Sequence, residues 1–422
     1  MKLIKSSIIK GSIAAPASKS MMQRAIAAAL LAEGTTTILN PTFCNDSLAA
    51  LRVIAELGAQ VIRGKNEVSI RGGMNPSGPG TILNCGESGL GIRMFTPIAS
   101  LWGGELTLTG EGSLLSRPVF MIEEPLKRLG VGVTTTNGCP PLKVKGPMMG
   151  GEAEVDGSVS SQFLTGLLMA LPKAPKDSRL TVTNLKSTPY IDMTLALLGA
   201  FGVQVRHVNY ETFFINGNQI YACQKGEYRV EGDWSGAAFL LVAGAVAALA
   251  GGVTVTGLNR ASPQADRKII EALSSAGALV EMTGDSVTVR KDKLNGFYFD
   301  ATHCPDLFPP LVALACNCEG TTVITGVERL VHKESNRAMV LEKEFSALGA
   351  NIRIVGNRME IEGGKLKGGV VDSHNDHRIA MAAAVAALNA QGDVTIQGDE
   401  CVAKSYPDFF EDLKKIGGNV YE

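Results

Sequence analysis

The pattern of hydrophobic and polar positions along this chain repeats. A nearly continuous apolar helical stretch is followed by an alternating strand, an amphipathic helix, a glycine turn and further alternating strands, and the series then begins again. The strand after each apolar stretch opens on Gly or Asp, as in Gly34-Thr-Thr-Thr-Ile. The glycine of the turn recurs at intervals of 68 to 75 residues, as Gly58, Gly130, Gly202, Gly277, Gly349 and Gly417. Six copies at near-constant spacing predict a sixfold internal repeat.

The first helix of each repeat is apolar on most sides, and such a helix is buried. These helices are expected at residues 20–32, 89–102, 161–171, 235–250, 307–316 and 378–388. The longest apolar run, Gly236 to Gly252, is marginal in length for a bilayer and is interpreted as a buried helix. We predict an α/β fold of two similar domains, each with three βαβαββ-type repeats whose parallel helices lie inside. A solenoid is the alternative, but the repeat is long for one and its charged residues differ between copies.

Length, charge and cysteine usage narrow the class of protein. A chain of 422 residues is too long for one ordinary core. The 40 Lys and Arg residues nearly balance the 41 Asp and Glu residues, which gives no support to nucleic-acid binding through a global basic field. Eight scattered cysteines and a start, Met1 to Lys5, without the apolar run of a signal peptide predict a reducing cytoplasm.

The helix that follows Ser18 carries cations where acids are usual. Lys19, Ser20 and Arg24 occupy its first two turns, and Ser20 and Arg24 are spaced i,i+4 on one face. Unpaired backbone N–H groups and the helix dipole favour an anion at this end, so the two cations predict a phosphate or carboxylate ligand. A solvated helix start is the alternative.

Other helix starts share this chemistry. The Gly-rich segment 85–93 ends on Arg93, which can close on an anion held by backbone N–H groups. Arg117 precedes a proline, and the run Ser160-Ser161-Gln162 supplies hydroxyl donors. A tight turn or ordinary capping explains each of these features equally well when taken alone.

Carboxylates stand among the cations in the second half of the chain. Asp306 begins a strongly apolar helix, where a carboxylate is expected to have a lowered pKa and to orient or deprotonate a hydroxyl. Glu334 lies between Lys333 and Arg337, which are spaced i,i+4. Charged segments of this kind more often form salt bridges on a solvent-exposed face.

The run Asp376-His377-Arg378 again places a cation at a helix start, and Lys404 follows near the C-terminus. We expect no metal site, because His374 and His377 have no evident third ligand and the Cys316/Cys318 pair has no second pair.

Taken together and in order, these motifs resemble the enolpyruvyl transferases. The resemblance covers nearly the whole chain, including the sixfold repeat. Within that family it is closer to the members that act on shikimate 3-phosphate than to those that act on UDP-N-acetylglucosamine, which have Asn where Ser20 stands and lack the Asp-His-Arg triplet.

The resemblance implies two globular domains, at 18–229 and at 1–17 plus 230–422, with the active site in the cleft between them. It implies a cytoplasmic transferase of the shikimate pathway to chorismate and aromatic amino acids. Its substrates would be phosphoenolpyruvate and shikimate 3-phosphate, with no metal or organic cofactor and no nucleic-acid or membrane partner. We expect a monomer.

Site residues carry over from the family by position. Shikimate 3-phosphate is expected to bind Lys19, Ser20, Arg24, Ser160, Ser161, Gln162, Ser187, Tyr190, Asp306 and Lys333. Phosphoenolpyruvate is expected to bind Lys19, Gly89, Arg93, Arg117, Gln162, Arg337, Arg378 and Lys404. The expected catalytic residues are Asp306, Glu334, Lys19, His377 and Lys404.

The family reaction adds the shikimate 5-hydroxyl to C2 of phosphoenolpyruvate while C3 is protonated, and then eliminates phosphate from a tetrahedral intermediate. By this resemblance Asp306 is the base toward the hydroxyl, Glu334 the acid and base at C3, and Lys19 a further proton carrier. His377 would orient Glu334. Clustered Arg and Lys suit both substrates, because both are polyanions and charge develops as phosphate leaves.

The chain also departs from the family pattern. Glu87 and Leu90 stand where Asn and Thr are frequent, and Met94 replaces a common Pro. We predict a reshaped phosphoenolpyruvate side and weaker inhibition by glyphosate than in a typical sensitive enzyme. Asn336 replaces a frequent Asp, and Arg329 a frequent Asn.

Two other classes of function stay open at this stage. A transferase with a different acceptor alcohol would keep the cations yet ignore shikimate 3-phosphate. A non-catalytic phospholigand-binding protein would tolerate Asp306→Asn and Glu334→Gln. The presence of both carboxylates argues against the second class, since a pure anion binder gains nothing from them.

Overall fold

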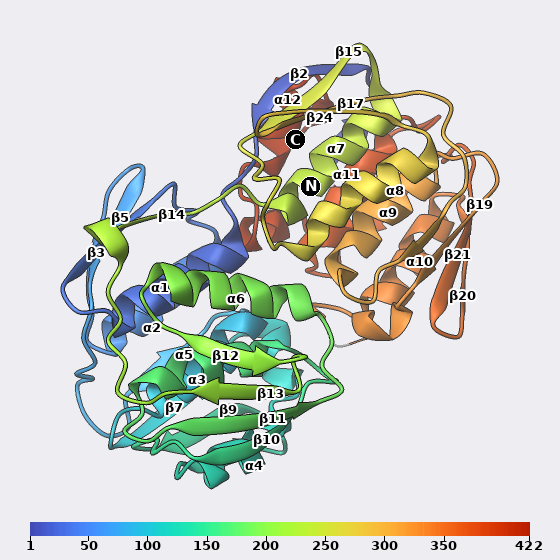
Figure 1. The fold of residues 1–422 in the computed structure, drawn as a ribbon. Helices are drawn as coiled ribbons and strands as arrows, with labels where there is room; N and C mark the ends of the chain where they lie inside the picture. Colours follow the sequence, from blue (N-terminus) through green and yellow to red (C-terminus); the bar gives the residue numbers. More distant parts are fainter. Residues whose placement is uncertain (332) are drawn as a thin grey trace. The chain divides into compact units, whose positions relative to one another are not determined.

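The computed structural model describes residues 1–331 and 333–422, and it divides the chain into two compact units (Figure 1). One unit is Lys19–Val230, and the other joins Met1–Ser18 to Glu231–Glu422. The described residues form six four-stranded sheets, three in each unit.

The unit Lys19–Val230 contains three repeats of the same order of elements. The first repeat has α1 (Lys19–Leu31), β3 (Thr35–Leu39), α2 (Asn45–Glu56), β4 (Gln60–Arg63) and β5 (Glu67–Arg71), completed by β14 (Glu227–Arg229). The second has β6 (Ile82–Asn84), α3 (Gly89–Ala99), β7 (Glu105–Thr109), α4 (Glu123–Arg128), β8 (Gly132–Thr136) and β9 (Cys139–Lys145). The third has β10 (Glu152–Asp156), α5 (Gln162–Ala170), β11 (Ser178–Thr183), α6 (Thr188–Ala200), β12 (Val205–Val208) and β13 (Thr212–Ile215).

The second unit repeats this order three more times. Its first repeat has β2 (Ile9–Ala14), α7 (Trp234–Ala247), β15 (Ala248–Thr256), α8 (Ile269–Ala276), β16 (Leu279–Thr283) and β17 (Ser286–Arg290). The next has β18 (Tyr298–Asp300), α9 (Phe308–Ala315), β19 (Thr321–Thr325), α10 (Arg337–Ala347), β20 (Asn351–Val355) and β21 (Arg358–Glu362). The last has β22 (Gly369–Asp372), α11 (His377–Ala387), β23 (Val394–Gln397), α12 (Phe409–Lys415) and β24 (Asn419–Tyr421), and β1 (Lys2–Lys5) completes its sheet.

Every sheet has the same pairing. One edge strand runs parallel to its neighbour, and the other two neighbouring pairs are antiparallel, as in the order β10-β11-β13-β12. Two edge strands are exchanged between repeats. β2 precedes α1 in the chain but pairs with β15, while β14 precedes α7 but pairs with β3. The chain therefore crosses twice between the units.

The apolar helices form the core of each unit. Helices α3, α9 and α11 are buried along their whole length, and Ser235 is the one residue of α7 that is not. Within their own units α3 packs against α5, and α7, α9 and α11 pack against one another. A helix buried on all sides needs no polar face, which explains the Ala-rich sequence. The predicted fold class, with three βαβαββ repeats per unit and the helices inside, is confirmed.

The recurrent glycine has a backbone cause. At all six positions φ is positive, between 75° at Gly202 and 106° at Gly58, a region that L side chains rarely adopt. At Gly58 a side chain would also clash, because a Cβ would lie 2.7 Å from the backbone nitrogen of Asn75. At Gly202 there is room, since the nearest atom to a Cβ would be 3.8 Å away.

The expected helix at 235–250 is too long. Helix α7 ends at Ala247, and residues 248–256 form β15 beside β2. Gly251 and Gly252 have φ of 100° and 67°, which no α-helix continues, and the β-branched residues after them join the sheet. The prediction failed because the pairing strand lies more than 230 residues away in sequence.

Candidate functional site

In the unit Lys19–Val230, four residues assigned to phosphoenolpyruvate lie together at the start of α3. A Cβ at Gly89 would be 2.9 Å from Arg117 Nη1 and 3.1 Å from Arg93 Nη1. Arg93 also donates to Gln162 Oε1 at 2.8 Å, which joins the starts of α3 and α5. Two guanidinium groups beside a helix N-terminus favour an anion at this position, and the assignment of these residues to phosphoenolpyruvate stays a prediction.

Lys19 lies at the start of α1 against an acid that the sequence did not single out. Its Nζ is 2.9 Å from Oδ2 of Asp46, a buried residue of α2. The starts of α1 and α3 are tied by Ser88, which caps α3 and donates to Gln23 Oε1 at 2.8 Å. The first turns of α1, α3 and α5 therefore lie close together in this unit.

Arg24 is more deeply buried than the sequence indicated. It is 1% exposed and donates to the Thr194 hydroxyl at 3.0 Å and to the carbonyls of Ser20 and Tyr190 at 2.9 and 3.2 Å. Burial lowers the pKa of Arg24 to about 10. These contacts brace α1 against α6, and the assignment of Arg24 to shikimate 3-phosphate stays a prediction.

The hydroxyl residues assigned to shikimate 3-phosphate stand at the starts of α5 and α6. Ser160 Oγ accepts from the backbone N–H of Gln162 at 3.2 Å, and Ser161 is the residue before α5. Ser187 precedes α6 with a left-handed φ of 58°, and Tyr190 lies in the first turn. Their roles toward substrate stay predictions.

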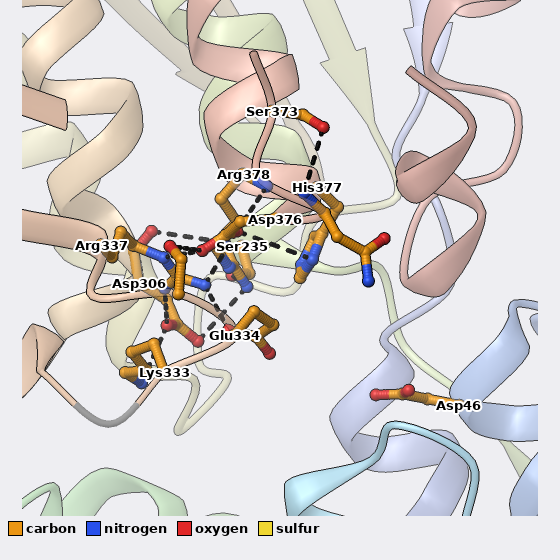
Figure 2. Close-up of polar contacts among 12 residues, drawn as sticks. Asp46, Ser235, Asp306, Lys333, Glu334, Arg337, Ser373, Asp376, His377 and Arg378 are labelled. Carbon is orange, nitrogen blue, oxygen red and sulfur yellow. Dashed lines mark hydrogen bonds and ion pairs between the residues drawn. The ribbon is translucent and has the colours of Figure 1, made fainter. Parts of the chain in front are cut away.

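In the second unit, Arg337 lies among three carboxylates (Figure 2). Its guanidinium donates to Asp376 Oδ2 at 2.9 Å, to Asp306 Oδ1 at 3.0 Å and to Glu334 Oε2 at 2.5 Å, and the side chain is 1% exposed. Burial alone would lower the pKa of Arg337, but the three carboxylates, Asp376 foremost, raise it. Arg337 is therefore a fixed cation that positions both proposed catalytic carboxylates.

Asp306 is held by two further cations. Lys333 Nζ lies 3.1 Å from Oδ1, and Arg378 Nη2 lies 3.3 Å from Oδ2. Burial alone would raise the pKa of Asp306, but Arg378, Lys333 and Arg337 hold it well below its usual range. Asp306 is therefore ionised and suited to accept a hydrogen bond from a hydroxyl.

The start of α11 completes this cluster. Asp376 caps the helix by accepting from the backbone N–H of Arg378 at 3.0 Å, and His377 Nδ1 lies 3.9 Å from Asp376 Oδ1. Arg378 Nη2 donates to Ser235 Oγ at 2.6 Å (Figure 2). Lys404, buried at the end of the short 3-10 helix η8 (Asp399–Lys404), belongs to a segment packed on α11. The structure thus brings Asp306, Glu334, Arg337, Arg378 and Lys333 together, while the predicted orientation of Glu334 by His377 stays a prediction.

Sequence reasoning missed three contributors to these clusters. Asp376 and Asp46 were not given roles as ion-pair partners, and Ser235 was not singled out. Its backbone N–H donates to Asp233, which caps α7, at 3.2 Å. No local pattern revealed that the Ser235 hydroxyl meets Arg378, which lies 143 residues further along the chain.

Residues 1–331 and 333–422 contain no group of three His, Cys, Asp or Glu side chains arranged to hold a metal ion. His374 instead contacts Glu344 at 2.9 Å. In the same part of the chain no helix is long and apolar enough to cross a membrane. All eight cysteines are free thiols.

The family model described as EPSP synthase (3-phosphoshikimate 1-carboxyvinyltransferase) matches residues 4–413. The chain belongs to this family. A 3-phosphoshikimate 1-carboxyvinyltransferase of Methanocorpusculum labreanum is 40% identical to this chain over 427 residues. The alignment covers 100% of both proteins. Its namesake in Clostridium kluyveri is 39% identical, with 98% of this chain and 96% of the relative covered.

Solved structures agree with this membership. An EPSP synthase from Acinetobacter baumannii superposes with a TM-score of 0.82 at 28% identity, covering 100% of this chain and 99% of that one. The enolpyruvyl transferase NikO from Streptomyces tendae has a TM-score of 0.78 at 17% identity, covering 100% and 98%, and shares the fold. The prediction of a 3-phosphoshikimate 1-carboxyvinyltransferase, an enzyme of the shikimate pathway, is confirmed.

Proposed function

We propose that this chain transfers the enolpyruvyl group of phosphoenolpyruvate to the 5-hydroxyl of shikimate 3-phosphate and releases phosphate. The observation that carries the proposal is the pair of carboxylates, Asp306 and Glu334, bonded to one buried guanidinium, Arg337. Cations alone would serve to bind polyanions. Two carboxylates fixed among them add groups that accept and donate protons.

In the proposed addition step, the 5-hydroxyl oxygen attacks C2 of phosphoenolpyruvate as C3 takes up a proton. Asp306 accepts the hydrogen bond of that hydroxyl and takes its proton. Two of the cations that now lower the pKa of Asp306, Lys333 and Arg378, are the ones expected to turn toward substrate oxyanions, and their departure raises the basicity of the carboxylate. Substrate binding itself therefore prepares the base.

Glu334 is the proposed proton donor to C3 and the acceptor of a C3 proton when phosphate leaves the tetrahedral intermediate. Its bond to Arg337, at 2.5 Å, fixes the carboxylate three residues before α10 begins. Both steps are acid–base chemistry without a change in oxidation state, so the proposed reaction needs no redox cofactor. Lys19, His377 and Lys404 keep their predicted roles as supporting catalytic groups.

The remaining residues are proposed to bind the two anions. Phosphoenolpyruvate is assigned to Lys19, Gly89, Arg93, Arg117, Gln162, Arg337, Arg378 and Lys404. Shikimate 3-phosphate is assigned to Lys19, Ser20, Arg24, Ser160, Ser161, Gln162, Ser187, Tyr190, Asp306 and Lys333. The guanidinium pair beside Gly89 and the cations around Asp306 support these assignments, because charge-assisted bonds to oxyanions are the strong ones. We also propose a monomer that acts in the cytoplasm, in keeping with eight free thiols.

Phosphate release from phosphoenolpyruvate tests the proposal, with shikimate 3-phosphate or UDP-N-acetylglucosamine as acceptor. We expect release with shikimate 3-phosphate alone, and a loss of kcat of about 10²- to 10⁴-fold in Glu334→Gln. Glu344→Gln is the matched control, since Glu344 is also a buried, ion-paired carboxylate but bonds to His374. Release with neither acceptor, from protein shown to be folded, would overturn the proposal.

A further inference from the structure

Gln23 and Ser88 form a buried polar link between α1 and α3 that has no role in the proposed reaction. The Ser88 hydroxyl donates to Gln23 Oε1 at 2.8 Å, and the two residues are 1% and 0% exposed. Gln23 Nε2 has no hydrogen-bond partner among the residues that the structure describes. A buried amide with an unpaired donor costs folding free energy, and most other buried positions of α1 are apolar. The presence of Gln23 therefore calls for an explanation other than stability.

The Ser88 hydroxyl is fixed both as an acceptor and as a donor. Its oxygen accepts from the backbone N–H of Gly91 at 3.0 Å, which caps α3, while its proton goes to Gln23. A hydroxyl has one proton to donate, so the two bonds define the orientation of the side chain. The cap needs only an acceptor. The bond to Gln23 therefore adds something that capping does not require, a fixed position of the start of α3 against α1.

On α1 the link is next to Lys19. Gln23 lies one helical turn after Lys19 on the same face, since the two residues are spaced i,i+4. Asp46 of α2 holds the Lys19 ammonium at 2.9 Å. Helix α2 also lies against the loop before α3, where a Cβ at Gly86 would be 3.3 Å from Ala49 Cβ. The bond between Gln23 and Ser88 therefore joins two helix starts that α2 already supports.

On α3 the link is next to Gly89, the first residue of the helix. A Cβ at Gly89 would lie 2.9 Å from Arg117 Nη1 and 3.1 Å from Arg93 Nη1, so two cations approach the backbone closely at this point. Like charges this near to each other repel, and their surroundings must hold them in place. Gly89 follows Ser88 directly and Arg93 is one turn further along α3, so a shift of the helix start moves both residues.

We propose that Gln23 and Ser88 are positioning residues that hold the first turn of α3 in place for phosphoenolpyruvate. The inference rests on the proposed function, in which Gly89 and Arg93 bind that substrate and not shikimate 3-phosphate. Donors that are already in place lower the cost of ordering the site when the anion arrives. Both residues act through the start of α3 and not by contact with the substrate.

Steady-state kinetics of the full chain test the proposal. Gln23→Met keeps the length of the side chain but removes the acceptor, and Ser88→Ala removes the donor. We expect each variant to raise KM for phosphoenolpyruvate about two- to tenfold, the effect of one lost hydrogen bond. KM for shikimate 3-phosphate should change less than about twofold. Ser88→Thr keeps the hydroxyl and should retain a KM for phosphoenolpyruvate near that of the parent chain.

Ser100→Ala is the matched control for a merely structural role. Ser100 is a buried hydroxyl at the far end of α3 that donates to the carbonyl of Thr96 at 2.8 Å, so its loss should leave KM for phosphoenolpyruvate near that of the parent chain. Gln23→Met should keep the urea midpoint of unfolding close to that of the parent, because it removes an unpaired amide together with the acceptor. An equal rise in KM in Ser100→Ala, or an equal rise for both substrates in Gln23→Met, would overturn the proposal.

Arg117→Lys separates this inference from the proposed function, because it changes a residue assigned to phosphoenolpyruvate itself. An unchanged KM for phosphoenolpyruvate in Arg117→Lys would overturn the assignment of that substrate to the start of α3, and with it this inference. A raised KM in Arg117→Lys but not in Gln23→Met or Ser88→Ala would overturn the inference alone. We further expect Gln23→Met to add little in the Ser88→Ala background, because the two residues act through one bond. Fully additive effects would overturn the proposal.

Discussion

Asp376 makes the clearest energetic prediction, because its carboxylate is fully buried and accepts four bonds. It accepts from Arg337 Nε at 2.9 Å and Nη2 at 3.2 Å, from the Ser335 hydroxyl at 3.2 Å and from the Arg378 N–H at 3.0 Å. Asp376→Asn keeps the size and the helix cap but removes the charge. It also replaces one carboxylate oxygen, which accepts hydrogen bonds, with an amide NH₂ group that would face the donors of the neighbouring residues.

The magnitude follows from the partners that remain. Removing one member of a buried ion pair costs about 3–5 kcal/mol, because the other charge stays buried. Arg337 keeps Glu334 and Asp306, so the lower end applies. Asn is as good an N-cap as Asp, so the cap contributes nothing to the difference. We expect Asp376→Asn to lower the free energy of unfolding of its unit by about 3 kcal/mol.

The assay must report on one unit, since a chain of two compact units need not unfold in a single step. The sequence offers such a probe. Of its two tryptophans, Trp234 lies in the unit that contains Asp376 and Trp102 in the other. In a Trp102→Phe background, urea unfolding followed by Trp234 fluorescence should show a midpoint lower by about 1 M, with an m-value near 3 kcal/mol per M.

Asp372→Asn is the matched control. Asp372 is exposed and accepts from the backbone N–H of His374 at 2.7 Å, so its loss should cost less than about 1 kcal/mol. A midpoint for Asp376→Asn no lower than that of Asp372→Asn would refute the reasoning, because the buried pair with Arg337 would then contribute nothing.

Three further predictions concern the turns, the buried acid and inhibition. Gly58→Ala should destabilise its unit by about 2–4 kcal/mol and Gly202→Ala by about 1–2 kcal/mol. Both residues have a left-handed φ, but only at Gly58 would the new Cβ clash with backbone atoms. Equal losses of stability in urea unfolding would contradict this prediction. Since burial raises the pKa of Asp266 to about 7, the folded chain holds a proton that the unfolded chain releases above about pH 4, and stability should fall as pH rises from about 4 to 7. Asp266→Asn should flatten that fall in unfolding midpoints measured across this range, and an unaltered slope would count against it. Glyphosate should inhibit the parent chain weakly and the Glu87→Asn, Leu90→Thr variant more strongly in the phosphate-release assay; low-micromolar inhibition of the parent would contradict the prediction.

The repeat was predictable because its markers are local. A left-handed residue after a helix requires glycine whatever surrounds it, so the six turns are visible in the sequence. The apolar helices are visible for the same reason, since burial on all sides removes polar positions. The end of α7 was not visible, because the apolar residues 248–250 also suit a helix. They belong to a strand only because β15 pairs with β2, which is distant in sequence.

The candidate site also combines residues with a local sequence signal and residues whose contacts are distant in sequence. Cations near helix starts are a local signal, and this signal singled out Arg93, Arg337 and Arg378 as candidates. The acceptors that hold them are distant in sequence: Gln162 is 69 residues from Arg93, and Asp376 is 39 from Arg337. These contacts exist because the repeats pack with their helix starts at one end of each unit. A sequence periodicity predicts which ends meet, but it does not identify the side chains that pair.

The balance of charge around Arg337 bears on how the reaction begins. Three cations, Lys333, Arg337 and Arg378, lie against the three carboxylates Asp306, Glu334 and Asp376. An oxyanion that enters this cluster must therefore take a cation from a carboxylate. Arg337 is the least free to move, because it is 1% exposed and bound on three sides. Lys333 and Arg378, each paired to Asp306, are the ones that we expect to change partner. The carboxylate that loses them is the proposed base, so its basicity should rise only when substrate is present.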